Sequence, residues 1–154
     1  MNKIKFNFLL VLSFIVSAAI PNPPDLGVGS YVLYEPNTKK VLVSFNADEP
    51  VQPASLTKLM TSYVVADYIK EDFIRLDDTP KISIKAWKTE GSRMFIREGT
   101  KVAVSDLIKG MIIQSGNDAS VALAEHVAGS EENFAYLMNE YASQLGMQNS
   151  SFNN

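Results

Sequence analysis

The sequence predicts a mixed fold of the α/β (α+β) class, in which a β-hairpin is followed by several helices. Hydrophobic residues make up 46% and charged residues 20% of the 154 residues, as in a folded globular protein. Two runs rich in Val, Leu, Tyr and Phe, at residues 30–34 and 40–45, flank a Glu-Pro-Asn-Thr-Lys turn segment, which is typical of a hairpin. Apolar residues spaced three and four apart then indicate helices in the rest of the chain.

The first helix is expected at residues 54–70, directly after Pro53, whose missing N–H is tolerated at a helix start. Its apolar positions recur with helical spacing and form one stripe, made of Leu56, Leu59, Met60, Tyr63 and Val64. Further along, residues 81–85 alternate Lys-Ile-Ser-Ile-Lys, which predicts a short half-buried strand.

Three more helices are expected in the second half of the chain. Helical spacing covers residues 105–113, and a second helix spans 118–128 and ends at Gly129. The last helix has Ser130 as its N-cap and two glutamates in its first turn, where the helix dipole favours anions. Its expected core face consists of Phe134, Leu137, Met138, Tyr141 and Leu145.

The N-terminus has the composition of a secretory signal peptide. Lys3 and Lys5 precede an apolar run at residues 6–20, and small residues stand at 17–19 after its most apolar part, so we expect a signal peptide at 1–19. An uncleaved N-terminal anchor is the alternative, although the run is short for a membrane span. A linker rich in Pro and Gly is expected at 20–29, before a domain at 30–154. The prediction is export across the inner membrane, to the periplasm or the outer face of the cytoplasmic membrane.

Composition excludes several kinds of site. The net charge is −3 and no basic stripe is visible, so nucleic-acid binding has no support. The chain has no cysteine, which excludes disulfides, thiolate catalysis and cysteine-based metal sites. The single histidine, His126, excludes a histidine-rich metal site and is expected to be a helix residue near a C-terminal end.

Ser55 and Lys58 stand three residues apart at the start of the first predicted helix. Residues at this spacing share one helix face, so the two side chains point into the same space. A serine hydroxyl is a weak nucleophile until a base takes its proton, and a lysine held neutral part of the time can be that base. A surface helix start with a solvated lysine gives the same pattern, so Ser-x-x-Lys alone does not decide the function.

Ser115-Gly116-Asn117 separates two predicted helices, where it can present a hydroxyl and an amide to a cleft. The alternative interpretation is a simple interhelical turn, because Ser, Gly and Asn are common turn residues. The order of the two motifs is more specific than either alone. A Ser-x-x-Lys helix start followed by a Ser-x-Asn loop is the order used by serine acyltransferases that react with β-lactams.

Several segments then resemble one family in the correct order: Pro53–Thr61, Gly91–Phe95, Val104–Gly110, Gln114–Ala119 and Leu145–Met147, with Phe152. The chain resembles the low-molecular-mass penicillin-binding proteins of peptidase family S11, which are serine-type D-alanyl-D-alanine carboxypeptidases. The resemblance covers roughly residues 30–154. It implies the N-terminal part of a β-lactamase/DD-transpeptidase-like fold, an antiparallel sheet with flanking helices that is incomplete in this chain.

The resemblance also implies the roles of individual residues. Ser55 would attack the carbonyl of the penultimate D-alanine in a peptidoglycan stem peptide ending in D-Ala-D-Ala, and Lys58 would accept its proton. Ser115 would relay a proton to or from the leaving nitrogen, and Asn117 would bind the substrate amide. β-Lactams would act as acylating inhibitors, and the resemblance implies no cofactor or metal.

The sequence departs from the family pattern in one respect. The third family motif, Lys-Thr-Gly, does not occur, and the nearest match, Lys88-Thr89-Glu90, stands between the first two motifs. We therefore expect an N-terminal fragment of low stability that is inactive or weakly active. Membrane association is expected only through a missing C-terminal anchor or an uncleaved signal. The alternative functions are a class A-like β-lactamase and a non-catalytic truncated product that binds peptidoglycan stems.

Overall fold

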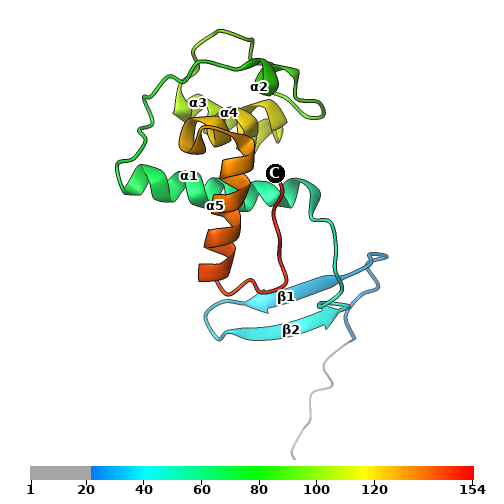
Figure 1. The fold of residues 1–154 in the computed structure, drawn as a ribbon. Coiled ribbons are helices and arrows are strands. Elements are labelled where there is room, and N and C mark those ends of the chain that lie inside the picture. Colours follow the sequence, from blue (N-terminus) through cyan, green and yellow to red (C-terminus); the bar gives the residue numbers. More distant parts are fainter. Residues whose placement is uncertain (1–21) are drawn as a thin grey trace, which may run out of the picture. The chain divides into compact units, whose positions relative to one another are not determined.

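The computed structural model describes residues 22–154, and Figure 1 shows the elements in chain order. The described residues form two compact units, one ending at Val51 and the other spanning Gln52–Asn154. The predicted signal peptide at 1–19 lies outside the described residues. In the described part of the chain, no helix is long and apolar enough to cross a membrane.

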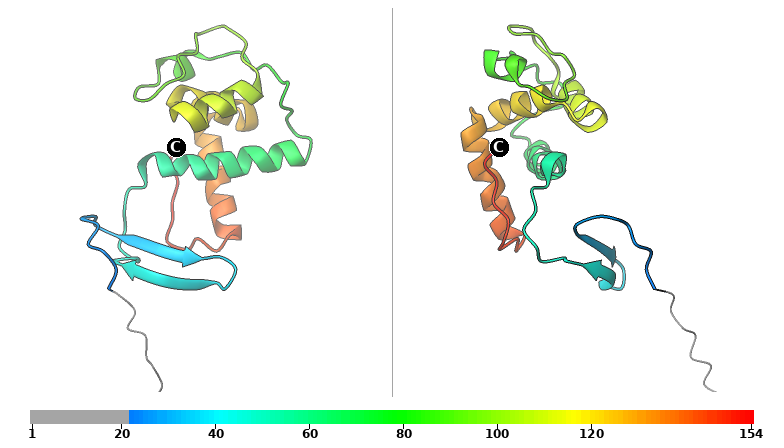
Figure 2. Two further views of the ribbon diagram at one scale, coloured as in Figure 1. Left: turned by 180° about the vertical axis from the view of Figure 1, so that it is seen from behind. Right: turned by 90° about the vertical axis from the view of Figure 1, so that its right-hand side faces the viewer.

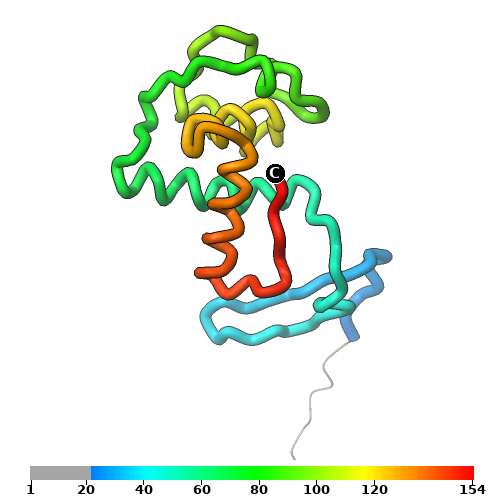
Figure 3. The backbone as a smooth tube through the Cα atoms, in the orientation of Figure 1, coloured from blue at the N-terminus to red at the C-terminus, as the bar shows by residue number. Residues whose placement is uncertain are grey.

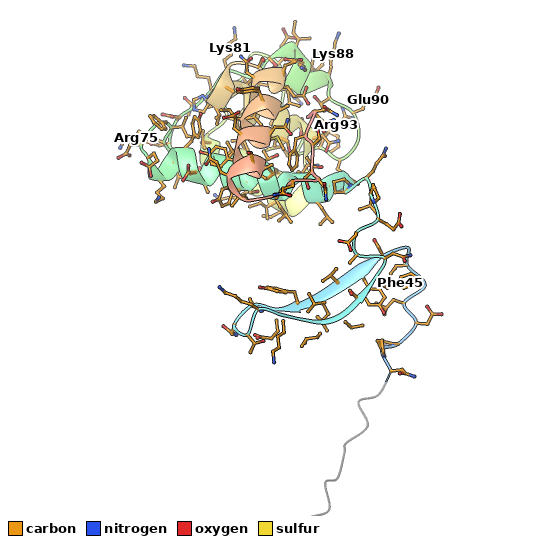
Figure 4. All side chains as sticks on the ribbon, turned by 60° about the horizontal axis from the view of Figure 1, so that its bottom comes forward. Phe45, Arg75, Lys81, Lys88, Glu90 and Arg93 are labelled. Atoms are coloured by element: carbon orange, nitrogen blue, oxygen red, sulfur yellow. The ribbon has the colours of Figure 1, made fainter. Side chains whose placement is uncertain are left out.

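The first unit is the predicted hairpin. Strands β1 (Tyr31–Glu35) and β2 (Lys40–Phe45) pair antiparallel, with Tyr31 opposite Phe45 and Glu35 opposite Lys40. The Tyr31 and Phe45 rings stack with their centroids 6.0 Å apart, and Figure 4 labels Phe45 at the end of its strand. The β-rich runs and the turn composition therefore predicted this hairpin correctly.

The turn between the strands is closed by the carboxylate of Glu35. It accepts hydrogen bonds from the Thr38 hydroxyl, from the Thr38 N–H at 2.6 Å and from the Asn37 N–H at 3.1 Å. These donors favour the charged carboxylate, so they lower the pKa of Glu35 to about 2. Lys39 then takes a positive φ of 55°, which turns the chain into β2.

The second unit is helical. Its elements are the 3₁₀ helix η1 (Ala54–Thr57) and the helices α1 (Lys58–Lys70), α2 (Ile84–Lys88), α3 (Val104–Gln114), α4 (Asn117–Ala128) and α5 (Glu131–Gln144). Helix α4 contacts α1, α2, α3 and α5, and Figure 2 shows α1 lying beside α4 and α5. Its side chains at Ala119, Val121, Ala122, Leu123 and Ala124 are all buried. A helix covered by four others is the centre of this core.

The first predicted helix begins differently from the expectation. Residues 54–57 form a 3₁₀ turn, and the α-helix begins only at Lys58. Met60 and Val64 are buried as predicted, together with Thr61 and Val65. The other residues of the apolar stripe are not covered in this unit, since Leu56, Leu59 and Tyr63 are 67%, 70% and 49% exposed. Helical spacing identifies apolar positions, but packing against α4 and α5 decides which of them this unit covers.

The predicted strand at residues 81–85 is wrong beyond Ile82. The backbone of Ile82 pairs with Thr100, its N–H donating to the Thr100 carbonyl at 2.9 Å. Ser83 then starts α2, because its hydroxyl accepts a hydrogen bond from the Ala86 N–H at 3.0 Å. A serine that caps a helix interrupts the alternating pattern at its third residue.

The helix ends in the second half follow the sequence closely. Gly129 ends α4 with a φ of 80°, and the Ser130 hydroxyl caps α5 by accepting from the Asn133 N–H at 3.1 Å. On α5, Phe134 and Met138 are buried, Leu137 and Tyr141 are half-buried, and Leu145 is 49% exposed. The tail after α5 runs back along it (Figure 3), where Asn139 and Phe152 exchange hydrogen bonds of 2.7 and 2.9 Å.

Candidate active site

Ser55 and Lys58 lie at the junction of η1 and α1. Ala54 precedes Ser55 with a φ of 48°, and this left-handed residue turns the chain sharply into η1. In a 3₁₀ helix, side chains three residues apart are eclipsed, which is tighter than the α-helical spacing assumed from sequence. The Lys58 Nζ accordingly lies 3.4 Å from the Ser55 Oγ.

Ser115 reaches the same hydroxyl from the break between α3 and α4. It ends α3 in a left-handed conformation, with φ 53° and ψ 36°. Its Oγ donates a hydrogen bond of 3.0 Å to the Ser55 Oγ, although the two residues are 60 positions apart. Ser55 Oγ therefore lies between a lysine amine and a second serine hydroxyl.

Asn117, the first residue of α4, ties three segments together. Its side-chain oxygen accepts a hydrogen bond of 2.7 Å from the Lys58 Nζ. Its side-chain nitrogen donates to the Glu90 carbonyl at 2.8 Å, and its backbone N–H donates to the Ser92 carbonyl at 2.7 Å. The amide is thus fixed in one orientation, with its oxygen facing Lys58.

The loop that holds Asn117 requires a glycine at position 91. Gly91 has a φ of 88°, and a Cβ placed on it would lie 2.6 Å from the Asn117 Nδ2. Cβ atoms do not approach other heavy atoms this closely in folded proteins, so a side chain at this position would displace the amide. Gly91 is therefore part of the support of the site, although it contacts no reacting group.

Asp118 fixes the next part of the same loop to α4. Its side chain is 1% exposed, and its carboxylate accepts from the backbone N–H groups of Met94 (3.0 Å), Ile96 (3.2 Å) and Ala119 (2.9 Å). Buried carboxylates need such donors, because an unpaired charge in the core is costly. Asp118 thus holds the loop in place directly beside Asn117.

Partial burial shifts the pKa of the Lys58 side chain. The side chain is half-buried at the base of the site, and this partial desolvation lowers the pKa of Lys58 because it disfavours the charged ammonium. A larger share of Lys58 is therefore neutral at a given pH than for an exposed lysine. That is the direction a lysine base requires.

An open pocket of about 410 Å³ lies over these groups. Its size falls in the range of small-molecule sites. The residues that line it are Ala54, Ser55, Thr57, Lys58, Thr61, Thr89, Asn117, Ser120, Val121, Glu131 and Asn154. Ser55, Lys58 and Asn117 are thus accessible to a ligand from the same side.

The structure brings all four sequence-predicted site residues together. Ser55, Lys58, Ser115 and Asn117 form one hydrogen-bonded group. His126 lies apart from it on α4, with its Nε2 3.2 Å from the Asp78 Oδ2. Among residues 22–154 no cluster of three or more His, Cys, Asp or Glu side chains could hold a metal ion.

Sequence reasoning missed four contributors to the site. The Glu90 and Ser92 carbonyls act through the backbone, so no residue type signals them. Gly91 was named only as the first residue of the family-like segment Gly91–Phe95. The position of Asp118 was a signal, because an acidic residue is favoured in the first turn of a helix. Its partners Met94 and Ile96, however, are distant in sequence.

The chain also matches known proteins in sequence. Residues 17–154 match the family model of the peptidase S11 D-alanyl-D-alanine carboxypeptidases. The chain belongs to this family. It is 44% identical over 153 residues to the D-alanyl-D-alanine carboxypeptidase DacC of Escherichia coli K12, a match that covers 96% of this chain and 38% of DacC. The S11 chain thus spans well under half the length of that relative.

Solved structures confirm the predicted fold class of this S11 chain. The D-alanyl-D-alanine carboxypeptidase DacD of Francisella tularensis superposes with a TM-score of 0.84 at 40% identity, covering 88% of this chain and 33% of DacD. Penicillin binding protein 5 of Haemophilus influenzae gives a TM-score of 0.82 at 43% identity, covering 86% of this chain and 39% of that protein. The S11 chain has part of the DD-transpeptidase/β-lactamase-like fold, made of helices and a small antiparallel sheet.

Proposed function

We propose that this S11 chain carries the nucleophile side of a serine-type carboxypeptidase that removes the terminal D-alanine from peptidoglycan stem peptides. The observation that supports this most strongly is the environment of the Ser55 Oγ. It lies 3.4 Å from the Lys58 Nζ and 3.0 Å from the Ser115 Oγ. The Lys58 Nζ in turn donates a hydrogen bond of 2.7 Å to the side-chain oxygen of Asn117. This group can activate a hydroxyl without histidine.

In the proposed reaction, neutral Lys58 takes the proton of the Ser55 hydroxyl as its oxygen attacks the carbonyl carbon of the penultimate D-alanine. The carbon–nitrogen bond then breaks. Ser115 passes the proton that Lys58 took up on to the departing nitrogen, so that D-alanine leaves as a neutral amine and Lys58 is neutral again. The shortened peptide remains as an ester on Ser55. Water hydrolyses the ester and restores the hydroxyl. Asn117 keeps Lys58 in place and offers its amide to the substrate.

The negative oxygen formed during attack needs hydrogen-bond donors. The N–H groups of the first turn of a helix have no intrahelical acceptor, so the N–H of Ser55 is available in η1. The family resemblance places a second donor on the strand that carries Lys-Thr-Gly, a tripeptide that does not occur in these 154 residues. Loss of one such donor lowers the rate by about 10²–10³ in a comparable site.

Two further proposals concern the ligands and the location of the chain. A β-lactam presents a reactive amide to Ser55 and would remain bound as an ester; the similarity to a penicillin binding protein supports this. The apolar run after Lys3 and Lys5 supports export, with the site on the periplasmic side of the membrane. We include no nucleic acid and no cofactor in the proposal.

The test uses two peptides, one ending in D-Ala-D-Ala and one ending in L-Ala-L-Ala. Each is incubated with the chain and with its Ser55→Ala variant, and both the intact protein mass and free alanine are measured. The proposal predicts an acyl adduct, with one D-alanine released per adduct, only for the first peptide and only with Ser55 present. Turnover should be slow because Lys-Thr-Gly is not in this sequence.

Three results would contradict the proposal. Equal D-alanine release by the Ser55→Ala variant would show that Ser55 is not the nucleophile. Rapid turnover of a chromogenic cephalosporin without a lasting adduct would favour the alternative class A-like β-lactamase. Peptide binding that forms no adduct and releases no alanine would favour the non-catalytic binder of peptidoglycan stems.

A further inference from the structure

A second hollow, of about 240 Å³, lies on the loop that supports the active site. It is lined by Trp87 from α2 and by Arg93, Phe95, Ile96 and Arg97 from the loop that follows. Arg93 directly follows Ser92, whose carbonyl binds the backbone of Asn117. The same loop therefore carries the support of the active site and this hollow.

The hollow combines positive charge with exposed aromatic rings. Within residues 22–154, neither Arg93 nor Arg97 has a carboxylate oxygen within 4.0 Å, although Glu90 and Glu98 stand nearby in the sequence. The Arg93 guanidinium lies 5.2 Å from the centroid of the Phe95 ring. An arginine fork without a carboxylate partner, stacked on an aromatic ring, is well suited to bind an external carboxylate.

Phe95 is held in a conformation that exposes its ring. Its φ is 64°, in the left-handed region that a bulky residue rarely adopts, and its side chain is 74% exposed. Trp87 beside it is 41% exposed. Ile96 also lines the hollow and is fixed in place, because it is 7% exposed and its N–H donates to the buried Asp118 carboxylate. Backbone strain that exposes an apolar ring, in place of burying it, is typical of a functional site.

From these observations we infer that the hollow binds the acidic, sugar-linked part of a peptidoglycan stem peptide. Arg93 and Arg97 would pair with a stem carboxylate, and Trp87 and Phe95 would pack against the apolar face of the sugar ring. This inference rests on the proposed function, since it assigns the part of the substrate remote from D-Ala-D-Ala. It explains why the loop that orients Asn117 also carries two arginines without ion pairs.

Trp87 provides the readout, because it is the only tryptophan in the chain. The chain is titrated with N-acetylmuramyl-L-Ala-D-Glu, and its fluorescence is followed. The matched probe is the diamide of the same compound, which lacks both carboxylates. Neither probe ends in D-Ala-D-Ala, so binding does not depend on Ser55. The inference predicts saturable fluorescence change with the acid and about tenfold weaker binding of the diamide.

The variants Arg93→Ala and Arg97→Ala should each weaken binding of the acid about tenfold. The control is Arg75→Ala, whose arginine is also exposed and lies at the opposite edge of this unit from Arg93 in Figure 4. Far-UV circular dichroism confirms that each variant is folded. Equal affinity for acid and diamide, or equal affinity of the Arg93 and Arg75 variants, would overturn the inference. Acylation of Ser55 in the same variants would show that the proposed function stands independently.

Discussion

The substitution Gly91→Ala tests the support of the site most sharply. The added Cβ would lie 2.6 Å from the Asn117 Nδ2, well inside van der Waals contact. The amide must then move away from the Glu90 carbonyl, which it now meets at 2.8 Å, and so from the Lys58 Nζ at 2.7 Å. The substitution therefore acts on Lys58 without touching it.

The size of the effect has two parts. A non-glycine residue at a φ of 88° costs about 1–2 kcal/mol of stability. Loss of the hydrogen bond between the neutral Lys58 amine and Asn117 costs about 0.5–1.5 kcal/mol in the active site. Because 1.4 kcal/mol is a factor of ten, acylation of Ser55 should slow by about 2–10-fold.

The matched control is Gly99→Ala. Gly99 has a similar φ of 75°, but the nearest atom to its added Cβ is the Lys81 Cε, at 3.9 Å. Both variants carry the backbone penalty, and only Gly91→Ala displaces Asn117. The assay is the rate of adduct formation with a β-lactam, measured by intact-protein mass spectrometry on samples quenched at timed intervals. If the two variants acylate at the same rate, the proposed support by Gly91 is refuted.

Three further predictions follow from single groups. The lowered pKa of Lys58 means that the neutral base accumulates as pH rises towards that pKa, so the acylation rate should rise with pH and then level off. Lys58→Arg, which stays charged, should lower the rate at least about 100-fold, and a pH–rate profile that is flat in the unmodified chain would oppose this role. Asp118→Ala leaves three backbone N–H groups without their acceptor and should reduce the free energy of unfolding by about 3 kcal/mol or more, seen as a lower urea midpoint. Ser130→Ala removes the N-cap of α5 and should cost about 1 kcal/mol in the same measurement; an unchanged midpoint would show that the cap contributes nothing.

Much of the fold was predictable because its signals are local. The hairpin turn, the glycine that ends α4 and the serine that caps α5 each depend on residues close together in the sequence. The strand predicted at residues 81–85 failed because the Ser83 cap competes with the alternating pattern. The apolar stripe of the first helix is covered only in part because burial depends on which neighbours cover it, as Leu59 and Tyr63 show.

The site was predictable as a set of side chains but not as a geometry. The pairing of Ser-x-x-Lys with Ser-x-Asn identified Ser55, Lys58, Ser115 and Asn117 as candidates. The 3₁₀ turn at Ser55 and the carbonyl of Glu90 could not be inferred, because neither backbone conformation nor a backbone acceptor follows from residue type. The hydrogen bond between residues 55 and 115 depends on how α1 packs against α3, which is a property of the whole unit.

The most direct test of the account is the intact mass of the chain after incubation with a penicillin, beside its Ser55→Ala variant. The account predicts one stable adduct, with the mass of the intact drug, on the unmodified chain and none on the variant. Peptide mapping should place that adduct on Ser55. No adduct on the unmodified chain, or an equal adduct on Ser55→Ala, would contradict the claim that Ser55 and Lys58 form a working acylation centre.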